Sequence, residues 1–526
     1  MTGLMLLLLA AAAAFGLSRF LRQPVIPVLL LVGFVLPYLG FSFDREDLSG
    51  AVIFGLTFLA FAMGIELNPR RAGRQRRAAV IVGVVQFLGL GGAGFVLARL
   101  MGFDVTASAY LALALCASST LVVVRHLKMR QQMFEPFGRL VNGVLLLQDG
   151  MVIVFMVVLF RAPDGPSGLL VGLGGAAGLF ALAYVCLRWV MPHLIIRKKL
   201  DEEALLLVTL TTFFCFTGLA HLLEVPLVVG AFLAGVSLSS FPVNGVVRGL
   251  INSLADFFLA IFFIALGMML TIPQGTALVQ ALVFVFFIVL VTPPLVAFVA
   301  ERTGLSFRAS LESGLLLAQA SEFSLLIGLY GVLLGLIPEE IFSIIALFTV
   351  LTMMLTPFVA TDDAARALMR WRPVRHRARD LMDEPENHVL LLGYGTNGRR
   401  LVEPLRAAGC RILVVDDDPA RIRTLRQEGV PCLQSDASST RTLEAAGARR
   451  AKLIVSSLRS TGDSENVLRY VKVSRVPVFV RVFDGAEKRR IENLNGIPIV
   501  TSEEAAKEFE RWFKVALGDE KSSLNS

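Results

Sequence analysis

Residues 143–155 read GVLLLQDGMVIVF, and they place Gln148 and Asp149 in the middle of an apolar run. The run extends over 138–161, which is long enough for a helix to cross the roughly 30 Å hydrocarbon core of a membrane. A carboxyl group at that depth is costly and is usually functional. A structural role would need a basic partner, and no Lys or Arg lies deep in any apolar run. The pair therefore predicts a functional site inside a membrane.

The composition divides the 526 residues into two parts. Residues 1–362 carry only 21 Lys and Arg and 19 Asp and Glu, whereas residues 363–526 carry 29 and 23. The first part is too apolar for a soluble domain and the second is ordinary. This excludes a soluble enzyme, a disordered chain and a nucleic-acid-binding protein, since the net charge of +8 is explained by basic residues beside a membrane. We predict a membrane domain at 1–362, a basic linker at 363–386, a soluble domain at 387–502, and a helix and tail at 503–526.

Basic residues alternate between the loops of the membrane part. They cluster after odd-numbered apolar runs, while loops after even-numbered runs are mainly acidic. The positive-inside rule then places the N-terminus outside, in the periplasm, and the soluble domain in the cytosol. The linker stretch ARALMRWRPVRHRAR at 365–379 is either an amphipathic helix on the headgroups or a solvated linker. The thirteen runs predicted to span the membrane are 2–18, 24–40, 50–67, 79–100, 106–126, 138–161, 168–190, 202–223, 226–240, 251–270, 274–300, 308–336 and 339–361.

Small polar residues interrupt two of these runs. Residues 114–123 read ALCASSTLVV, with Ser118, Ser119 and Thr120 in a row, and residues 318–324 read AQASEFS, with Gln319 and Glu322. The two runs are seven apart and so cross in opposite directions, as expected for an inverted repeat with two broken helices. A carboxylate beside the half-helix ends suits alternating binding of a monovalent cation and a proton. The alternatives are ordinary interhelical hydrogen bonds for the Ser/Thr cluster and a helix-terminus bond for Glu322.

Five motifs of the membrane part resemble a known family. The SST segment, the QD pair, GAFLAG at 230–235, FFIALGM at 262–268 and QASEF at 319–323 resemble Kef-type potassium efflux members of the monovalent cation:proton antiporter-2 superfamily. The resemblance implies a sodium/proton-antiporter-like fold and K⁺/H⁺ exchange. It assigns binding of both K⁺ and H⁺ to Asp149, and Gln148 before it implies electroneutral exchange. One departure is Thr292, where such antiporters commonly carry a Lys.

The soluble part begins with a pattern typical of dinucleotide-binding folds. A strand at 388–393, HVLLLG, is followed by GYGTNG at 393–398 and by a second strand, RILVVD, that ends at Asp416. Glycines at this spacing allow phosphate to approach a helix N-terminus, and the acid binds ribose hydroxyls. The alternative is a fold that merely needs a tight turn. The predicted nucleotide-binding residues are Gly393, Tyr394, Gly395, Thr396, Asn397, Gly398, Asp416, Asp417, Asp436 and Arg481.

The soluble part also resembles the N-terminal lobe of RCK domains, over about 388–500. The resemblance implies a Rossmann-like lobe that dimerises and binds NAD(H), AMP or ATP as a regulator. Some relatives bind glutathione through an Arg after the fifth strand, a position that Arg481 fits. Asp436 is either a ligand of the adenine end or a helix N-cap. A dehydrogenase is not expected, because no substrate domain follows and the lobe's single histidine, His388, stands at the very start of the first strand.

We therefore predict a homodimeric K⁺/H⁺ antiporter of the bacterial inner membrane, regulated by a nucleotide and not an enzyme. Its membrane domain is all-α and its cytosolic domain is α/β. Glutathione or an ancillary subunit are further candidate partners. Three alternatives remain at this point: a gated K⁺ efflux channel, a Na⁺/H⁺ antiporter, and a nucleotide or redox sensor that no longer transports.

Overall fold

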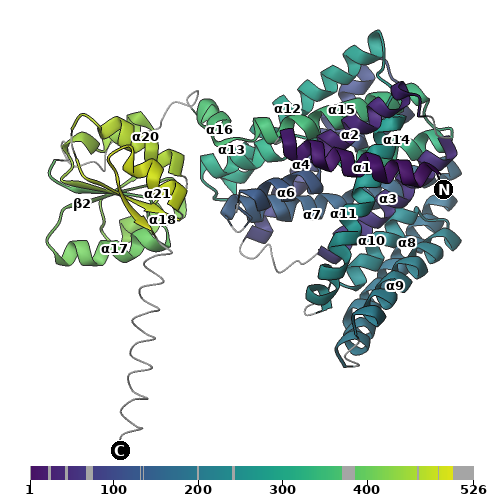
Figure 1. Ribbon diagram of the computed structural model, residues 1–526, viewed down its shortest axis with the longest axis horizontal. Coiled ribbons are helices and arrows are strands. Elements are labelled where there is room, and N and C mark those ends of the chain that lie inside the picture. The colour runs from purple at the N-terminus through teal and green to yellow at the C-terminus, as the bar shows by residue number, and fades with distance from the viewer. Residues whose placement is uncertain are drawn as a thin grey trace, which may run out of the picture. The chain divides into compact units, whose positions relative to one another are not determined.

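Two compact units make up the chain, which we describe from a computed structural model. The structure describes residues 2–21, 25–41, 45–66, 75–130, 132–133, 135–197, 201–239, 243–369, 386–458, 461–474, 476–483 and 485–500. The first unit comprises Met1–Thr303 and Ala309–Ala367, and the second Gly304–Arg308 and Leu368–Ser526. The regular elements among the described residues of the first unit are all helices, and the second contains a β-sheet (Figure 1).

Helices cover each of the thirteen predicted apolar runs in the first unit. Seven helical segments among the described residues are long and apolar enough to cross a membrane, and five further apolar helices are shorter. The count of thirteen crossings stays a prediction. The helices are α1 (Thr2–Leu21), α2 (Val25–Val35), η1 (Leu36–Leu39), α3 (Arg45–Glu66), α4 (Arg76–Leu100), α5 (Val105–Cys116), α6 (Thr120–Met129), α7 (Pro136–Arg161), η3 (Ala162–Asp164), α8 (Gly165–Val185), η4 (Cys186–Val190), η5 (Pro192–Arg197), α9 (Glu202–Leu222), α10 (Leu227–Ser237), α11 (Val243–Met269), α12 (Thr276–Arg302), α13 (Phe307–Leu316), α14 (Glu322–Leu333), α15 (Glu339–Val359) and α16 (Asp362–Met369).

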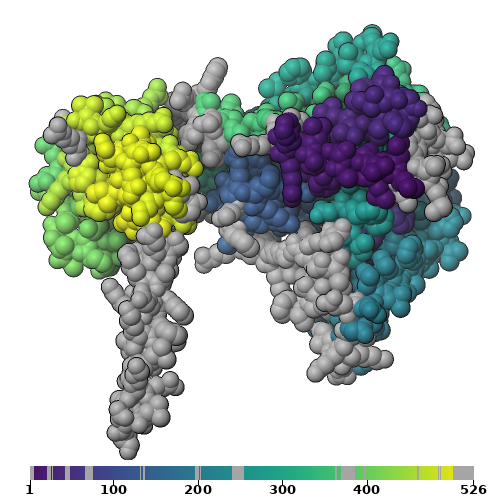
Figure 2. Space-filling view, in the orientation of Figure 1, coloured from purple at the N-terminus to yellow at the C-terminus, as the bar shows by residue number. Residues whose placement is uncertain are grey.

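The outer surface of this unit carries large apolar side chains. Helix α1 lies on the face shown in Figure 2, where it is purple. Its Leu9 and Phe20 are 67% and 85% exposed. Such a surface is unfavourable in water and favourable against lipid, which agrees with a membrane-embedded unit.

Paired glycines bring four helices of the unit into backbone contact. Gly235 of α10 faces Gly64 of α3, and Gly267 of α11 faces Gly33 of α2; a Cβ added at Gly235 would lie 2.9 Å from the Gly64 Cα. Small residues at such crossings let membrane helices approach closely. The glycines that end GAFLAG and lie in FFIALGM therefore have a packing role.

Two helices are broken at the predicted positions. Helix α5 ends at Cys116 and α6 begins at Thr120, while α13 ends at Leu316 and α14 begins at Glu322. Ser119 and Ser321 cap the second halves, because their hydroxyl oxygens accept hydrogen bonds from the N–H groups of Val122 and Phe323. Serine is favoured at a helix N-cap because its short side chain reaches the free N–H groups of the first turn.

The second unit contains a six-stranded parallel sheet in the order β3-β2-β1-β4-β5-β6. This order is that of the Rossmann fold and confirms the predicted α/β class. The elements are β1 (Val389–Leu392), α17 (Thr396–Ala407), β2 (Ile412–Asp416), α18 (Pro419–Gln427), β3 (Cys432–Gln434), α19 (Thr440–Ala445), η7 (Ala448–Arg450), β4 (Leu453–Ser456), α20 (Thr461–Val471), β5 (Val478–Val482), α21 (Gly485–Glu492) and β6 (Ile497–Val500). Most of the basic linker, 370–385, and the predicted C-terminal helix lie outside the described residues.

Candidate functional site

The two broken helices of the membrane unit bond directly to each other. The Ser118 hydroxyl, in the first break, donates a hydrogen bond of 2.7 Å to the Leu317 carbonyl oxygen in the second. The Ser324 hydroxyl of α14 donates one of 2.5 Å to the Ala114 carbonyl oxygen of α5. Both carbonyls lie where regular helical bonding ends, so the hydroxyls satisfy backbone groups that no water reaches.

Helix α7 brings the predicted Gln148–Asp149 pair to this crossing. The Ser118 backbone N–H donates to the Gln148 Oε1 at 3.2 Å, and the Thr120 hydroxyl donates to the Asp149 Oδ2 at 2.9 Å. The Asp149 side chain is buried, with 1% of the residue exposed. Its other oxygen, Oδ1, has no hydrogen-bond partner among the described residues. The arrangement leaves one carboxylate oxygen available for a proton or a cation.

The second break contributes Gln319 and Glu322, and both are buried. The Gln319 amide donates to the Leu316 carbonyl oxygen at 3.3 Å. Glu322 forms the first residue of α14 and lies close enough for its carboxyl group to interact electrostatically with Asp149. Two carboxyl groups in one dry site disfavour simultaneous ionisation.

Sequence reasoning missed residues from neighbouring helices that support the crossing. The Gln86 amide of α4 donates to the Ser118 hydroxyl oxygen at 3.1 Å, and the Thr352 hydroxyl oxygen of α15 accepts the Ala320 N–H at 3.1 Å. Gln86 interrupts the apolar run VIVGVVQFLGLGG, so the rule that singled out Asp149 could have found it.

Thr292, which the sequence analysis named, is fully buried, and its hydroxyl has no hydrogen-bond partner among the described residues.

The glycine loop of the second unit lies at the carboxyl end of β1, as predicted. Gly393 has a φ of +88°, which glycine adopts without strain. A Cβ at Gly398 would overlap with the Gly393 carbonyl oxygen, so this glycine allows α17 to start against the strand. Thr396 and Asn397 are the first two residues of α17.

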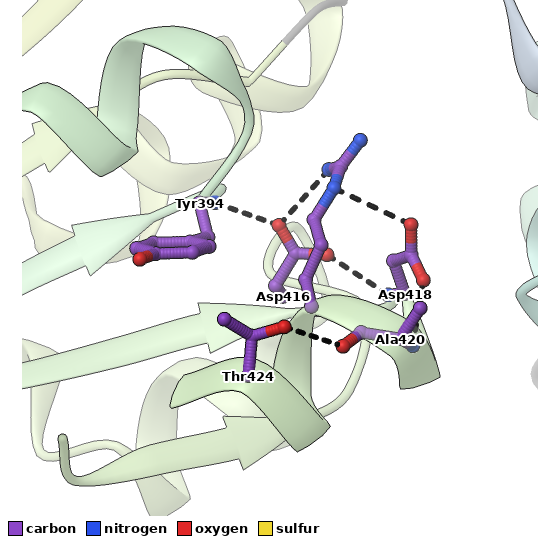
Figure 3. Close-up of polar contacts among 6 residues, drawn as sticks. Tyr394, Asp416, Asp418, Ala420 and Thr424 are labelled. Atoms are coloured by element: carbon purple, nitrogen blue, oxygen red, sulfur yellow. Dashed lines mark hydrogen bonds and ion pairs between the residues drawn. The ribbon is translucent and has the colours of Figure 1, made fainter. Parts of the chain in front are cut away.

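Asp416 ends β2 and is surrounded by donors (Figure 3). It accepts hydrogen bonds from the backbone N–H groups of Tyr394, at 2.6 Å, and Asp418, at 2.8 Å. The Arg421 guanidinium donates to it at 3.2 Å. Tyr394 thus joins the site through its backbone, because its ring is buried and its hydroxyl donates to Glu428 at 3.1 Å.

Two other predicted ligands have different surroundings. The Asp436 carboxylate accepts hydrogen bonds from the N–H and hydroxyl of Ser438, at 3.0 and 2.8 Å, in a turn before α19. Arg481, expected after the fifth strand, lies inside β5 in register with Ile499 and stacks on Phe483 at 4.6 Å. That expectation was wrong because the β5 ladder to β6 continues through Val482.

The neighbouring acid, Asp417, has a perturbed titration. Burial, followed by repulsion from Asp416, raises the pKa of Asp417 to about 6. A carboxyl group with a pKa of about 6 beside a candidate nucleotide site would make the binding of an anionic ligand there depend on pH.

The helical unit, with its crossed broken helices, matches a known family over nearly its whole length. Residues 4–361 match the transmembrane sodium/hydrogen exchanger family. The chain belongs to this family. Residues 389–503 of this exchanger match the TrkA-N domain.

Individual relatives match the chain over most of its length. The exchanger is 26% identical over 470 residues to the glutathione-regulated potassium-efflux system protein KefC of Enterobacter sp. (strain 638), covering 86% of this chain and 73% of that one. It is 26% identical over 439 residues to KefC of Escherichia coli O6:H1, covering 82% and 70%. Among solved structures, the sodium proton antiporter MjNhaP1 from Methanocaldococcus jannaschii is 16% identical with a TM-score of 0.57, covering 70% of this chain and 98% of that one. This last similarity confirms the antiporter-like fold.

Proposed function

We propose that this protein exchanges K⁺ for H⁺ and that Asp149 binds the two ions in turn. The observation that carries the proposal is the buried Asp149 carboxylate, one oxygen of which is bonded to Thr120 while the other has no hydrogen-bond partner among the described residues. Hydroxyl and carbonyl oxygens around the two breaks can replace the hydration shell of a cation. The names of the KefC relatives support K⁺ as the cation.

Alternating occupancy at one carboxylate explains how exchange would be coupled. With K⁺ or with H⁺ bound, Asp149 carries no net charge; empty, it is an isolated anion in a dry site, which is unfavourable. The site therefore changes its exposure from one side of the membrane to the other only when Asp149 has K⁺ or H⁺ bound. One K⁺ would move for each H⁺, and the exchange would be electroneutral.

We further propose the cellular arrangement and the regulator. The protein would form a homodimer in the bacterial inner membrane, with its N-terminus in the periplasm and its TrkA-N lobe in the cytosol. The lobe would bind NAD(H), AMP or ATP through the glycine loop and Asp416 and thereby alter the exchange rate. Glutathione, named in the KefC relatives, is a second ligand to test.

Transport in proteoliposomes tests the main proposal. Purified full-length protein is reconstituted with a pH-sensitive dye inside, and K⁺, Na⁺ or choline is added outside. Proton movement with K⁺ and little with Na⁺ or choline supports the proposal. K⁺ flux without proton movement would indicate a channel, proton movement with Na⁺ a Na⁺/H⁺ antiporter, and no flux with any nucleotide a sensor.

Substitution of Gln86 by Leu is expected to lower K⁺-dependent proton movement by about tenfold, because the Ser118 hydroxyl loses its donor and the cost of a lost buried hydrogen bond is about 1–3 kcal/mol. The same proteoliposome assay measures the effect. Thr57→Val is the control, since the Thr57 hydroxyl donates within its own helix, to the Ile53 carbonyl oxygen. Equal rates for Gln86→Leu and wild type would show that Gln86 does not contribute to transport.

Binding of NAD⁺ by the lobe is expected to tighten as the pH falls from 7.5 to 5.5. The pKa of Asp417 is raised from 3.8 to about 6, so the group is charged at the upper pH and largely protonated at the lower one. Loss of one like charge about 8 Å from a phosphate is worth about 1 kcal/mol at an effective dielectric constant near 40, or about fivefold in affinity. The charge of NAD⁺ itself does not change in this range. Asp417→Asn should bind equally at both pH values; if it keeps the wild-type slope, another group is responsible.

A further inference from the structure

Arg421 lies between the ribose-binding acid and the glycine loop of the lobe. It belongs to the first turn of α18, directly after the acidic residues that follow β2. Its Nη1 is 3.2 Å from the Asp416 Oδ2, and its Nε is 3.3 Å from the Asp418 Oδ2. The same Nη1 is 3.9 Å from the position that a Cβ on Gly395 would occupy. The guanidinium therefore lies where the ribose and the phosphates of a nucleotide would meet.

The Asp416 carboxylate already has three donors. Two are the backbone N–H groups of Tyr394 and Asp418 (Figure 3), which the ends of β1 and β2 hold in place. The third is Arg421. The Asp416 side chain is 2% exposed and the Arg421 side chain 29%. A carboxylate accepts about four hydrogen bonds, so only one position is left on Asp416. A ribose that binds through both of its hydroxyls must therefore displace a donor, and the partly exposed Arg421 side chain is the one that can leave.

The phosphates of a bound nucleotide need a cation that the glycine loop does not supply. GYGTNG contains neither Lys nor Arg. The start of α17 offers backbone N–H groups and a partial positive charge of about one half. A full charge beside Gly395 comes from Arg421, whose planar guanidinium suits phosphate oxygens.

We propose that Arg421 is a specificity-determining switch: the ribose displaces it from Asp416, and it then contacts the 5′-phosphates beside Gly395. This rests on the nucleotide binding proposed above. The ligand class is an adenosine nucleotide with 5′-phosphates and free 2′- and 3′-hydroxyls. Asp416, Asp417 and Asp418 together outweigh the single arginine, so a phosphate on the 2′-hydroxyl is repelled. NADP(H) is thereby discriminated against.

Equilibrium binding to the purified full-length protein tests this switch. Adenosine, ADP, NAD⁺ and NADP⁺ are titrated against wild type, Arg421→Gln and Arg421→Lys, with Arg423→Gln as a matched control on the exposed face of the same helix. Arg421→Gln is expected to weaken ADP binding by about 10- to 100-fold, the value of a charge-assisted hydrogen bond. It should leave adenosine binding unchanged or tighter, because Asp416 loses a competitor. Arg421→Lys should restore part of the preference for ADP, and wild type should bind NAD⁺ more tightly than NADP⁺.

Different results separate this switch from the underlying function. Equal losses of ADP and adenosine binding in Arg421→Gln, or an unchanged ratio of the two, would overturn the switch while nucleotide binding stands. Tighter binding of NADP⁺ than NAD⁺ by wild type would overturn the assigned ligand class. If wild type binds none of the four ligands, both the switch and the proposed regulation by nucleotide fail.

Discussion

Asp149→Asn is expected to reduce K⁺-dependent proton movement by at least about 100-fold, equivalent to about 2.8 kcal/mol. Asparagine has nearly the shape of aspartate and can still accept the hydrogen bond from Thr120. It can neither bind a proton in this pH range nor carry the negative charge that a bound cation needs. The substitution therefore removes the ionisable group and its negative charge, while the shape of the side chain is kept. Initial rates in proteoliposomes, at matched protein content, measure the loss.

A second carboxylate in the same unit provides the control for this experiment. The Asp256 side chain of α11 is 64% exposed and lies 3.8 Å from Arg125, so Asp256→Asn removes a charge without touching the crossing. It should transport at nearly the wild-type rate. Retention of more than about a tenth of wild-type exchange by Asp149→Asn, which corresponds to a cost below about 1.4 kcal/mol, would show that another group carries the ions. Glu322, buried at the start of α14, would be the next residue to substitute.

The parts of the fold that the sequence predicts are those with a strong local signal. Polar residues inside an apolar run located both helix breaks, because Ser and Thr compete with helical hydrogen bonds and cap new helices. The strand–glycine loop–strand pattern located β1, the loop and β2, because the glycines must follow the first strand directly. In both cases a few residues adjacent in the sequence determine the local structure.

The residues that sequence reasoning missed or misplaced depend on tertiary contacts. Gln86 meets Ser118 from another helix, 32 positions away in the chain, and nothing local shows which break it reaches. Arg421 resembles any other arginine of a basic, exposed helix until β2 places Asp416 beside it. Arg481 was placed after β5 on the resemblance to RCK lobes, yet it alternates with the buried Val480 and Val482 and stays within the ladder.

The close contact between α3 and α10 gives the second large expected effect. A Cβ at Gly235 would overlap with the Phe61 carbonyl oxygen and lie 2.9 Å from both the Gly64 Cα and the Ile65 nitrogen. All three atoms belong to the backbone of α3, so no side chain can rotate away. The two helices must separate, and their buried interface loses packing along its length.

Gly235→Val is therefore expected to destabilise the protein by about 3 kcal/mol or more, because overpacking at a backbone contact cannot relax locally. Unfolding midpoints of the detergent-solubilised protein, followed by size-exclusion chromatography after heating, measure the effect. Gly178→Ala in α8 is the matched control, since no atom lies within 4 Å of a Cβ at that position. The control should be neutral or more stable by up to about 1 kcal/mol, the helix preference of alanine over glycine. A Gly235→Val protein with the wild-type midpoint would mean that α3 and α10 do not pack through their glycines, and the GAFLAG motif would then need a role other than packing.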